Sequence, residues 1–426
     1  MGILPKSNLM EILSSEITCP LGQLVLASYS KDRIEGLTAK VFDGSKSTDK
    51  EIIEEAKKLD KPLIGISITA GNNENSFPLA KKLHENGLDV IVGGPEVTMV
   101  GEKIIEGRPY IKRAIIGAGE QILINLLKGE ESTQISGRLL DFKGINVDYK
   151  LLNNLNDYNG LTYLWANDCQ NSKNRCYFCG RISLGIGFRD PKKVWEEIKF
   201  LHKLGIKNFY NCADTVATSV SEFEKFVRTR PRGLEDAVHK VFINANQTNE
   251  TTTPLLRKLN SLVHIGVENI ALYDKVGKNN SLAGDNDQAL MQLQKENIPV
   301  VLSFVIGMPG ENQETLKINR EYIKKIAERY GIIKQLEISP LMITHGSRAY
   351  HDLMSIPIIS NKYKSKQLPY DTIEMSTDYF RHFCNIDRKT ALYWIKELGR
   401  DLKNINPNVE IDSKGISLED YQLIKK

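Results

Sequence analysis

Residues 168–180 read DCQNSKNRCYFCG and hold three of the chain's six cysteines, Cys169, Cys176 and Cys179. Their spacing is C-x6-C-x2-C, and a C-x2-C pair lets two sulfur atoms reach one metal ion or cluster from a single turn. A structural zinc site takes four ligands and a cubane cluster takes four cysteines, so three cysteines predict a cluster with one open iron. The alternatives are a zinc site completed by Cys212 or a histidine, and three unrelated reduced cysteines.

Beyond this segment, short apolar runs alternate with amphipathic stretches. One strand is expected at Leu161–Ala166, directly before the cysteines. Further strands are expected at Asn208–Asn211, Val241–Ala245, His264–Val267, Val300–Ile306 and Gln335–Ile338. Helices are expected at Lys192–Leu204, Val220–Arg228, Thr253–Leu259, Asp287–Glu296 and Glu314–Tyr330. Six strands joined by helical crossovers predict a partial or full (β/α) TIM-type barrel, whose active site forms at the carboxyl ends of the strands.

The first third of the chain predicts a second α/β unit. Strands are expected at Gln23–Tyr29, Leu63–Ile68, Asp89–Gly93 and Arg113–Ile116, and helices at Asp49–Leu59 and Ser76–Asn86. This alternation favours a parallel, doubly wound, Rossmann-like sheet. The turns Gly93-Gly94-Pro95-Glu96 and Gly117-Ala118-Gly119-Glu120 follow two of these strands, at the edge where ligands of such sheets usually bind.

The cysteine segment resembles the cluster loop of radical S-adenosylmethionine (radical SAM) enzymes. Their commonest spacing is C-x3-C-x2-C, and this chain has three extra residues in the first gap. The resemblance implies a [4Fe-4S] cluster on Cys169, Cys176 and Cys179, with S-adenosylmethionine chelating the fourth iron. It also places Phe178 near the adenine of S-adenosylmethionine.

Polar residues at the predicted strand ends fit the same resemblance. It assigns the end of the second strand, with Asp214, to the amino group of S-adenosylmethionine, and Glu268 to its ribose or methionine part. Asn246, after the third strand, belongs to the same set. The stretch Ser303–Glu311 matches one common in the superfamily, which implies cofactor contacts at Ser303 and backbone near the adenine at Ile306 or Gly307. Asp214, Asn246 and Glu268 are equally compatible with helix caps or turn residues.

The order of the first third, with its two glycine-rich turns, resembles the cobalamin-binding domain that precedes the barrel in many radical enzymes. The family motif Asp-x-His-x-x-Gly, which supplies a histidine to cobalt, is absent, and the only histidine of this region, His84, falls on a helix face. On this ground cobalamin is not expected as a cofactor. The alternative is a scaffold domain that packs on the barrel or helps to hold a substrate.

The tail is expected to form a helical extension. Residues 351–368 look like an irregular connection, and helices are expected at Thr377–Phe383 and Lys389–Asp401. The predicted domains are therefore a Rossmann-like cobalamin-binding-like domain at 1–150, a radical SAM barrel at 151–345 and a helical C-terminal extension at 346–426. Cys384 lies in this extension, and a lone cysteine in an apolar setting is most often inert.

The combination of a cobalamin-like domain without the cobalt histidine, the C-x6-C-x2-C loop and a late cysteine resembles the radical SAM epimerases of proteusin peptide maturation. The resemblance implies that a 5′-deoxyadenosyl radical removes a Cα hydrogen from an L-residue and that a thiol returns one from the opposite face. Cys384 is the candidate donor, because apolar burial keeps a thiol protonated. Cys212 is the rival donor, and Cys19 is expected to be structural. The implied partners are a ribosomal precursor peptide with leader and core, and a flavodoxin or ferredoxin as electron donor.

Composition excludes several other classes. A formal net charge of +4 is too small to argue for nucleic acid. No apolar run of eighteen residues and no signal-peptide layout is present, so a cytoplasmic protein without membrane contact is expected. Hydrolase pairings and a P-loop are also absent. Two further hypotheses stay open, a cobalamin-dependent radical SAM methyltransferase and a non-catalytic zinc-binding module.

Overall fold

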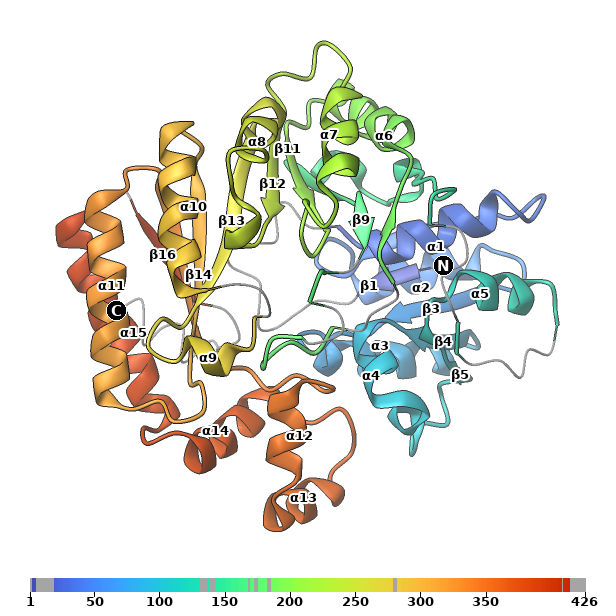
Figure 1. Cartoon of the computed structure of the whole chain (residues 1–426). Helices are drawn as coiled ribbons and strands as arrows, with labels where there is room; N and C mark the ends of the chain where they lie inside the picture. Colours follow the sequence, from blue (N-terminus) through green and yellow to red (C-terminus); the bar gives the residue numbers. More distant parts are fainter. Residues whose placement is uncertain are drawn as a thin grey trace.

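The computed structural model describes residues 2–4, 19–130, 136–137, 142–167, 169–171, 175–181, 185–278, 282–407 and 409–413. Two parallel sheets organise these residues, one formed by the N-terminal part of the chain and one by the remainder (Figure 1). Asp168 and residues 172–174 of the cysteine segment lie outside the described residues.

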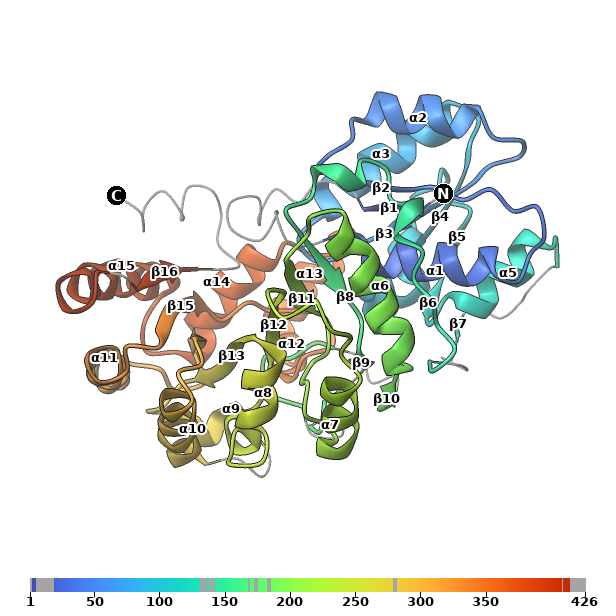
Figure 2. The same ribbon diagram turned by 90° about the horizontal axis from the view of Figure 1, so that it is seen from above.

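The N-terminal sheet has the strand order β2-β1-β3-β4-β5, and all its pairs are parallel. Its strands are β1 (Gly2–Leu4), β2 (Val41–Asp43), β3 (Leu63–Ser67), β4 (Asp89–Gly93) and β5 (Arg113–Ala114). Its helices are α1 (Leu21–Lys31), α2 (Asp49–Lys57), α3 (Asn73–Glu85), α4 (Pro95–Val100) and α5 (Glu120–Leu127). Helices α2 and α3 cover one face of the sheet, and α1 and α5 cover the other (Figure 2). The predicted doubly wound architecture is confirmed.

The prediction of a strand at Gln23–Tyr29 is wrong, because this segment lies inside helix α1. The buried side chains Leu21, Leu24, Val25 and Ser28 recur at the spacing of a helix, and Pro20 stands at the N-cap. An apolar run of seven residues does not by itself distinguish a buried strand from a buried helix. The first strand is instead β1, which pairs with both β2 and β3.

The second sheet has the order β16-β15-β14-β13-β12-β11-β8 and is parallel throughout. Its strands are β8 (Gly160–Tyr163), β11 (Asn208–Asn211), β12 (Val238–Phe242), β13 (Ser261–Glu268), β14 (Val300–Ile306), β15 (Ile333–Pro340) and β16 (Glu410–Asp412). The connecting helices are α6 (Pro191–Lys203), α7 (Val220–Arg228), α8 (Thr253–Leu259), α9 (Tyr273–Val276), α10 (Ala283–Lys295) and α11 (Gln313–Arg329). Since β8 and β16 are the two edges of this sheet, the barrel is partial.

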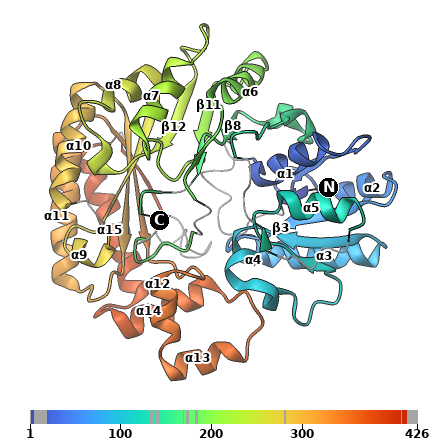
Figure 3. The same cartoon turned by 45° about the vertical axis from the view of Figure 1, so that its right-hand side comes forward.

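The seven-stranded sheet is curved, with its helices outside and its concave face turned toward the N-terminal domain (Figure 3). Side chains on the helix-facing surface are almost fully buried; Phe209, Val241, Ile265 and Leu302 are each at most 1% exposed. The hydrophobic core of this part of the chain therefore lies between sheet and helices, and the concave face is left for other roles.

The C-terminal part contains α12 (Arg348–Met354), α13 (Pro357–Lys364), α14 (Thr372–Phe383) and α15 (Arg388–Ile405). The expected helical extension is present, but the prediction of an irregular connection at 351–368 is wrong, since α12 and α13 occupy most of it. Ser347 caps α12 by accepting from the backbone N–H of Tyr350, and Pro357 occupies the first turn of α13.

Smaller elements complete the described fold. The short pairs are β6 (Ile116–Gly117) with β7 (Ser136–Gly137), and β9 (Ala166–Asn167) with β10 (Gly187–Phe188). The 3-10 turns are η1 (Gly101–Ile105), η2 (Tyr149–Leu151), η3 (Leu155–Asp157) and η4 (Ala245–Gln247). Within the ranges given above, no helix combines the length and apolar character needed to cross a lipid bilayer.

Candidate active site

The cysteine segment follows β8 at the carboxyl edge of the curved sheet, where a (β/α) barrel places its active site. The antiparallel pair β9–β10 joins the two ends of the loop, with Ala166 opposite Phe188 and Asn167 opposite Gly187. The loop therefore leaves the sheet and returns to it at one point, which keeps all three cysteines near the first strand.

Two distant segments hold the C-x2-C turn in place. The backbone N–H of Tyr177 donates to the carbonyl of Val276 at 2.8 Å, and the Tyr177 carbonyl accepts from Ala349 at 3.1 Å. The hydroxyl of Thr344 donates to the Phe178 carbonyl at 3.2 Å. A Cβ at Gly180 would lie 2.5 Å from the Thr344 hydroxyl oxygen, so only glycine fits beside the last cysteine. The turn is thus braced by the loops after β13 and β15.

The three thiols act on one another electrostatically, as expected for neighbours. Burial raises the pKa of Cys176 to about 12; positive Lys278 opposes this, and negative Glu268 together with the other two cysteines reinforces it. Burial also raises the pKa of the Cys169 thiol. The Arg175 guanidinium lies 3.8 Å from the Cys179 sulfur. Cations beside thiolates suit an anionic metal centre.

No group of three or more Cys, His, Asp or Glu side chains within the described ranges is gathered tightly enough to hold a metal ion. What suits the cysteine loop to an iron-sulfur cluster is therefore its three thiols and the cations beside them. The assignment of Cys169, Cys176 and Cys179 as cluster ligands remains a prediction.

Two residues predicted to contact the cofactor lie beside this loop. Asp214, just after β11, forms an ion pair with Arg181 at 2.6 Å and acts electrostatically on Cys169. Asn246, in η4 after β12, accepts a hydrogen bond from Gln170 at 3.3 Å. The ends of β11 and β12 thus converge on the cysteine loop, as the carboxyl ends of neighbouring parallel strands must. Their proposed contacts with S-adenosylmethionine remain predictions.

Glu268 at the end of β13 forms a buried ion pair that the sequence did not reveal. Its carboxylate lies 3.0 Å from the Lys278 ammonium, and the two side chains are 10% and 7% exposed. Lys278 also donates to the Gly266 carbonyl. Nothing in the local sequence distinguishes Lys278 from the chain's other lysines, because it stands in a loop without periodicity.

The backbone at this strand end is strained. Glu268 has φ of 69°, in the left-handed region that non-glycine residues rarely adopt, and the register with β14 shifts between Gly266 and Glu268. A Cβ at Gly266 would lie 2.1 Å from the Glu268 carboxylate oxygen, so the pair lies directly over that glycine. Bulges and strained residues cluster at functional sites, which supports a ligand-binding role for Glu268.

The end of β14 is braced by a buried carboxylate. Glu311 accepts from the backbone N–H of Gly307 at 3.0 Å, from the Asn269 amide at 2.7 Å and from the Thr315 hydroxyl at 2.5 Å. The Ile306 carbonyl accepts from the backbone N–H of Leu341 at 2.7 Å. The backbone groups predicted to face adenine are therefore already engaged, and the predicted contacts at Ile306 and Gly307 stay untested.

Ser303 lies on the concave face of β14, opposite Gly266 on β13 and Glu337 on β15 in the strand register. Its side chain is only partly buried, whereas its neighbour Leu302, facing the helices, is fully buried. Ser303 is thus placed where a ligand in the concave face could reach it, and its cofactor contact remains a prediction.

Gly307 gives a direct test of how closely the C-terminal helices pack on this site. It has φ of +110°, and a Cβ there would lie 2.4 Å from the Phe380 ring of α14. We expect Gly307→Ala to lower the free energy of unfolding by about 2–5 kcal/mol, from backbone strain plus overpacking. Gly310→Ala is the matched control: its φ is +90°, but nothing lies within 4 Å of the added Cβ. Equal losses in urea unfolding would show that the Phe380 contact contributes nothing.

Cys384 stands at the C-cap of α14, against the same loop. Its thiol lies 3.7 Å from the Met308 carbonyl, and the backbone N–H of the next residue, Asn385, donates to the backbone carbonyl of Glu311 at 2.8 Å. Burial raises the Cys384 pKa to about 12, and negative Glu311 raises it further. The thiol is therefore protonated at neutral pH.

Two other cysteines lie near the first barrel strand. Burial raises the pKa of Cys212 to about 12, so the rival thiol is protonated as well. Cys19 is buried, and its backbone N–H donates to the Thr162 hydroxyl of β8 at 2.9 Å. Cys19 thereby joins the N-terminal part of the chain to the barrel, which fits the structural role expected for it.

A buried pair connects the N-terminal domain to the loop that supports the cysteines. Glu96, in the first turn of α4, contacts the Nδ1 atom of His345, and the side chains are 6% and 3% exposed. His345 is next to Thr344, which holds Phe178. Met99 of α4 also packs against Gly346. His84, by contrast, is exposed on α3 and does not lie at this boundary.

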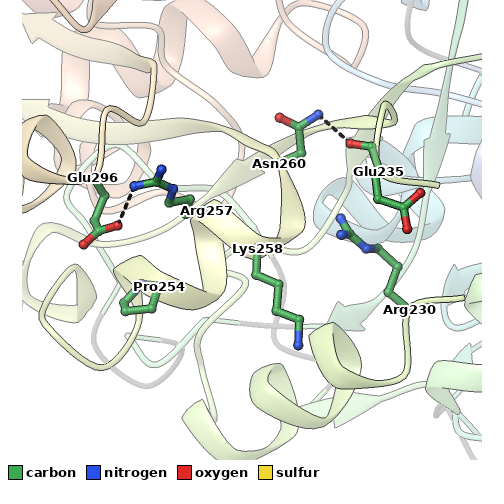
Figure 4. A pocket seen from close by; sticks show the side chains of 7 residues that line it. All are labelled: Arg230, Glu235, Pro254, Arg257, Lys258, Asn260 and Glu296. Atoms are coloured by element: carbon green, nitrogen blue, oxygen red, sulfur yellow. Dashed lines mark hydrogen bonds and ion pairs between the residues drawn. The ribbon is translucent and has the colours of Figure 1, made fainter. Parts of the chain in front are cut away.

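A cavity of about 540 Å³ lies elsewhere on the barrel (Figure 4). The side chains around it precede β12, β13 and β14, so the cavity opens at the amino ends of these strands. Its lining residues are Arg230, Glu235, Pro254, Arg257, Lys258, Asn260 and Glu296. This is the edge of a barrel that serves stability, opposite the cysteine loop.

Comparison with known proteins first gives sequence relatives; no family model matches the chain. The anaerobic magnesium-protoporphyrin IX monomethyl ester cyclase of Cereibacter sphaeroides is 27% identical over 281 residues, 57% of this chain and 45% of the cyclase. An uncharacterized methyltransferase of Pyrococcus horikoshii is 26% identical over 349 residues, 73% of this chain and 74% of that protein. The chain therefore spans less than half the length of the cyclase.

Two solved structures match more of this chain than the sequence relatives do. The radical SAM methyltransferase TsrM of Kitasatospora setae, with cobalamin and a [4Fe-4S] cluster bound, has a TM-score of 0.68 at 16% identity, over 83% of this chain and 74% of TsrM. The cobalamin-dependent radical SAM enzyme OxsB, with aqua-cobalamin and S-adenosylmethionine bound, has a TM-score of 0.72 at 14% identity, over 100% of this chain and 70% of OxsB. The chain thus has the fold of cobalamin-dependent radical SAM enzymes.

The prediction that cobalamin is not a cofactor is wrong. It depended on the missing histidine motif alone. Both of these structures hold cobalamin, and the match to OxsB includes the whole N-terminal domain. A histidine bound to cobalt is one contact among the many that a large cofactor makes with a domain. Its absence from the sequence therefore excludes only that one mode of attachment.

Proposed function

We propose that this chain is a radical SAM enzyme that uses cobalamin and transfers a methyl group to its substrate. The observation that supports this most is the combination of a doubly wound domain with a partial barrel whose concave face turns toward it (Figure 3), in a fold shared with two cobalamin-bound radical SAM enzymes. A methyltransferase among the sequence relatives supports the same reaction class.

Cys169, Cys176 and Cys179 would hold the [4Fe-4S] cluster. The cluster, S-adenosylmethionine and cobalamin would together supply the electron and the methyl group for the reaction. Arg175 and Lys278 place positive charge beside the cysteines and would stabilise the anionic cluster. Asp214 and Glu268 are carboxylates at the strand ends next to the cluster loop, where they would bind the cationic and hydroxyl groups of S-adenosylmethionine.

Cobalamin would bind at the carboxyl edge of the N-terminal sheet, where the order β2-β1-β3-β4-β5 creates a switch point between β1 and β3. Two turns at this edge, Thr69–Gly71 and Gly93–Gly94, carry small, partly exposed residues, beside which a large flat ligand would lie. Since His84 is exposed on α3, we propose that this domain provides no histidine to cobalt. The buried pair of Glu96 and His345 would keep this edge against the cysteine loop.

A radical SAM peptide epimerase is the second candidate function. One observation favours it: the Cys384 thiol lies at the rim of the barrel beside Met308 and is protonated, as a hydrogen-atom donor must be. In this function the substrate would be a ribosomal precursor peptide and the electron donor a flavodoxin or ferredoxin. Inversion needs a donor on the face opposite the abstraction, which a thiol on a separate helix would provide.

One experiment separates the two functions. The chain is expressed anaerobically with a cobalamin supply and the precursor peptide encoded nearest to its gene, in deuterated water, and both the peptide and the small-molecule products are analysed by mass spectrometry. We expect about one cobalamin per purified chain and a mass gain of one methyl group per modified site, unchanged in Cys384→Ala. Deuterium at Cα of D-residues, lost in Cys384→Ala, would instead establish epimerisation. A chain that retains iron but no cobalamin would overturn the methyltransferase proposal.

A further inference from the structure

The concave face of the curved sheet carries ring and charged side chains in the middle of its strands. Parallel strands covered on both faces are usually apolar throughout. Here the two faces differ: Val241 and Leu336, which face the helices, are fully buried, whereas Lys240 and Phe242 on the opposite face of β12 are partly exposed. The concave face is therefore incompletely packed, as expected for a surface that a ligand covers.

Three rings form a ladder across neighbouring strands of this face. Tyr210 of β11 meets Phe242 of β12 edge to face, with ring centroids 6.0 Å apart. Phe242 stacks on His264 of β13, with centroids 4.2 Å apart and an interplanar angle of 26°. Such contacts fix ring orientation and form an aromatic wall.

Charged groups lie directly beside the ladder. The Glu337 carboxylate of β15 lies 3.6 Å from the Lys240 ammonium and 3.7 Å from His264 Nε2. The Glu337 and His264 side chains are 7% and 2% exposed. Burying such groups costs several kcal/mol per charge, and apolar residues of similar size would stabilise a sheet interior at least as well. Their presence in mid-strand indicates a binding role.

These rings and charged side chains adjoin the cysteine site. Burial raises the pKa of Tyr210, and both Glu337 in the sheet and Asp214 at the rim act on this hydroxyl electrostatically. Ser303, which the sequence assigns to the cofactor, lies opposite Glu337 in the strand register. A ligand on this wall would therefore lie next to the groups predicted to hold S-adenosylmethionine.

We infer that Tyr210, Lys240, Phe242, His264 and Glu337, here called the inner-face cluster, bind the substrate, and that the substrate is a small ring-containing molecule carrying both a carboxylate and an amine. Lys240 would pair with the carboxylate and Glu337 with the amine, while the ring packs on Phe242 and Tyr210. Lys240 and Glu337 pair with each other in the free chain, and a ligand with a carboxylate and an amine would offer each of them an opposite charge, which a neutral peptide backbone does not. The inference rests on the proposed function, because it takes the concave face as the place of reaction.

Binding is tested by isothermal titration calorimetry on the full chain, both anaerobically reconstituted and metal-free. The probes are L-tryptophan and L-tyrosine, with N-acetyl-L-tryptophanamide as the matched ligand without charges. We expect saturable binding of the free amino acids and at least tenfold weaker binding of the blocked one. Lys240→Met and Glu337→Gln should each weaken binding of the free amino acids at least tenfold.

Lys207→Met is the control variant, because Lys207 precedes β11 and pairs with exposed Asp236 outside the concave face. It should bind like the unaltered chain. If Glu337→Gln fails to fold, Phe242→Leu replaces it, and loss of the ring wall should weaken binding by a similar factor. Absence of binding, or equal binding in the Lys240→Met and Lys207→Met chains, overturns the inference.

Cobalamin and iron content are measured on the same samples, which separates this inference from the proposed function. A chain that holds both cofactors but binds neither amino acid keeps the proposed function and loses the inference. A chain that lacks cobalamin but binds the amino acids through Lys240 and Glu337 keeps the inner-face cluster as a binding site and loses the methyltransferase reaction.

Discussion

Cys176→Ala is expected to abolish reductive cleavage of S-adenosylmethionine, with at least a hundredfold loss of rate, and to remove most of the bound iron. The reconstituted chain should carry about four iron atoms, as in a cubane cluster, and two remaining cysteines cannot retain it. Iron and sulfide analysis with an anaerobic cleavage assay measures both quantities. Cys176 is partly buried, and both Lys278 and Glu268 act on its thiol electrostatically.

Cys212→Ala is the control for this prediction. Cys212 is partly buried just after β11, outside the cysteine loop, and has no part in a three-cysteine cluster. The Cys212→Ala chain should keep its iron and its cleavage activity. A chain that binds zinc instead, and loses it equally on mutation of Cys176 or Cys212, would establish the four-ligand zinc site and rule out the radical reaction.

Lys278→Met is expected to destabilise the chain by about 3–5 kcal/mol, since it leaves the Glu268 carboxylate buried without its cation. Replacing both partners by methionine should restore most of that loss, because two apolar side chains carry no desolvation cost. The measurement is urea unfolding of the metal-free chain, with Glu268→Met completing the double-mutant cycle.

Lys207→Met gives the contrast for this pair. Lys207 and Asp236 form an ion pair at 2.7 Å, but their side chains are 59% and 49% exposed. Exposed pairs contribute about 0–1 kcal/mol, so this variant should unfold almost like the unaltered chain. Additive effects of the Lys278 and Glu268 substitutions would show that the two groups do not stabilise each other.

The sequence predicted the barrel elements best where a local signal marks both ends. Helix α7 has the predicted bounds Val220–Arg228, since Ser219 caps it, and β14 has the predicted bounds Val300–Ile306. Strand β12 begins three residues before its predicted position, at Val238, because His239 and Lys240 interrupt the apolar pattern. Strands of three residues, such as β1 and β16, carry too little pattern to be recognised alone.

In the candidate site, too, some residues could be predicted from the sequence and others could not. Asp214, Asn246 and Glu268 could be predicted to lie near the cysteines because parallel strands end at a common edge. Lys278 and His345 could not, since each stands in a loop whose path depends on tertiary contacts. His264 and Glu337 do leave a signal in the sequence, a ring or a charge in the middle of an otherwise apolar strand.

The position of β16 has a consequence for the order in which the chain folds. The N-terminal sheet is complete once residue 114 has been synthesised, and it can form while the rest of the chain is still being made. The barrel sheet cannot, because β16, the last strand in the part of the chain that the structure describes, covers the edge of β15 with residues 410–412. Until then β15 presents a row of unpaired backbone groups. Nascent chains halted between residues 340 and 410 should therefore associate with one another far more readily than the finished protein.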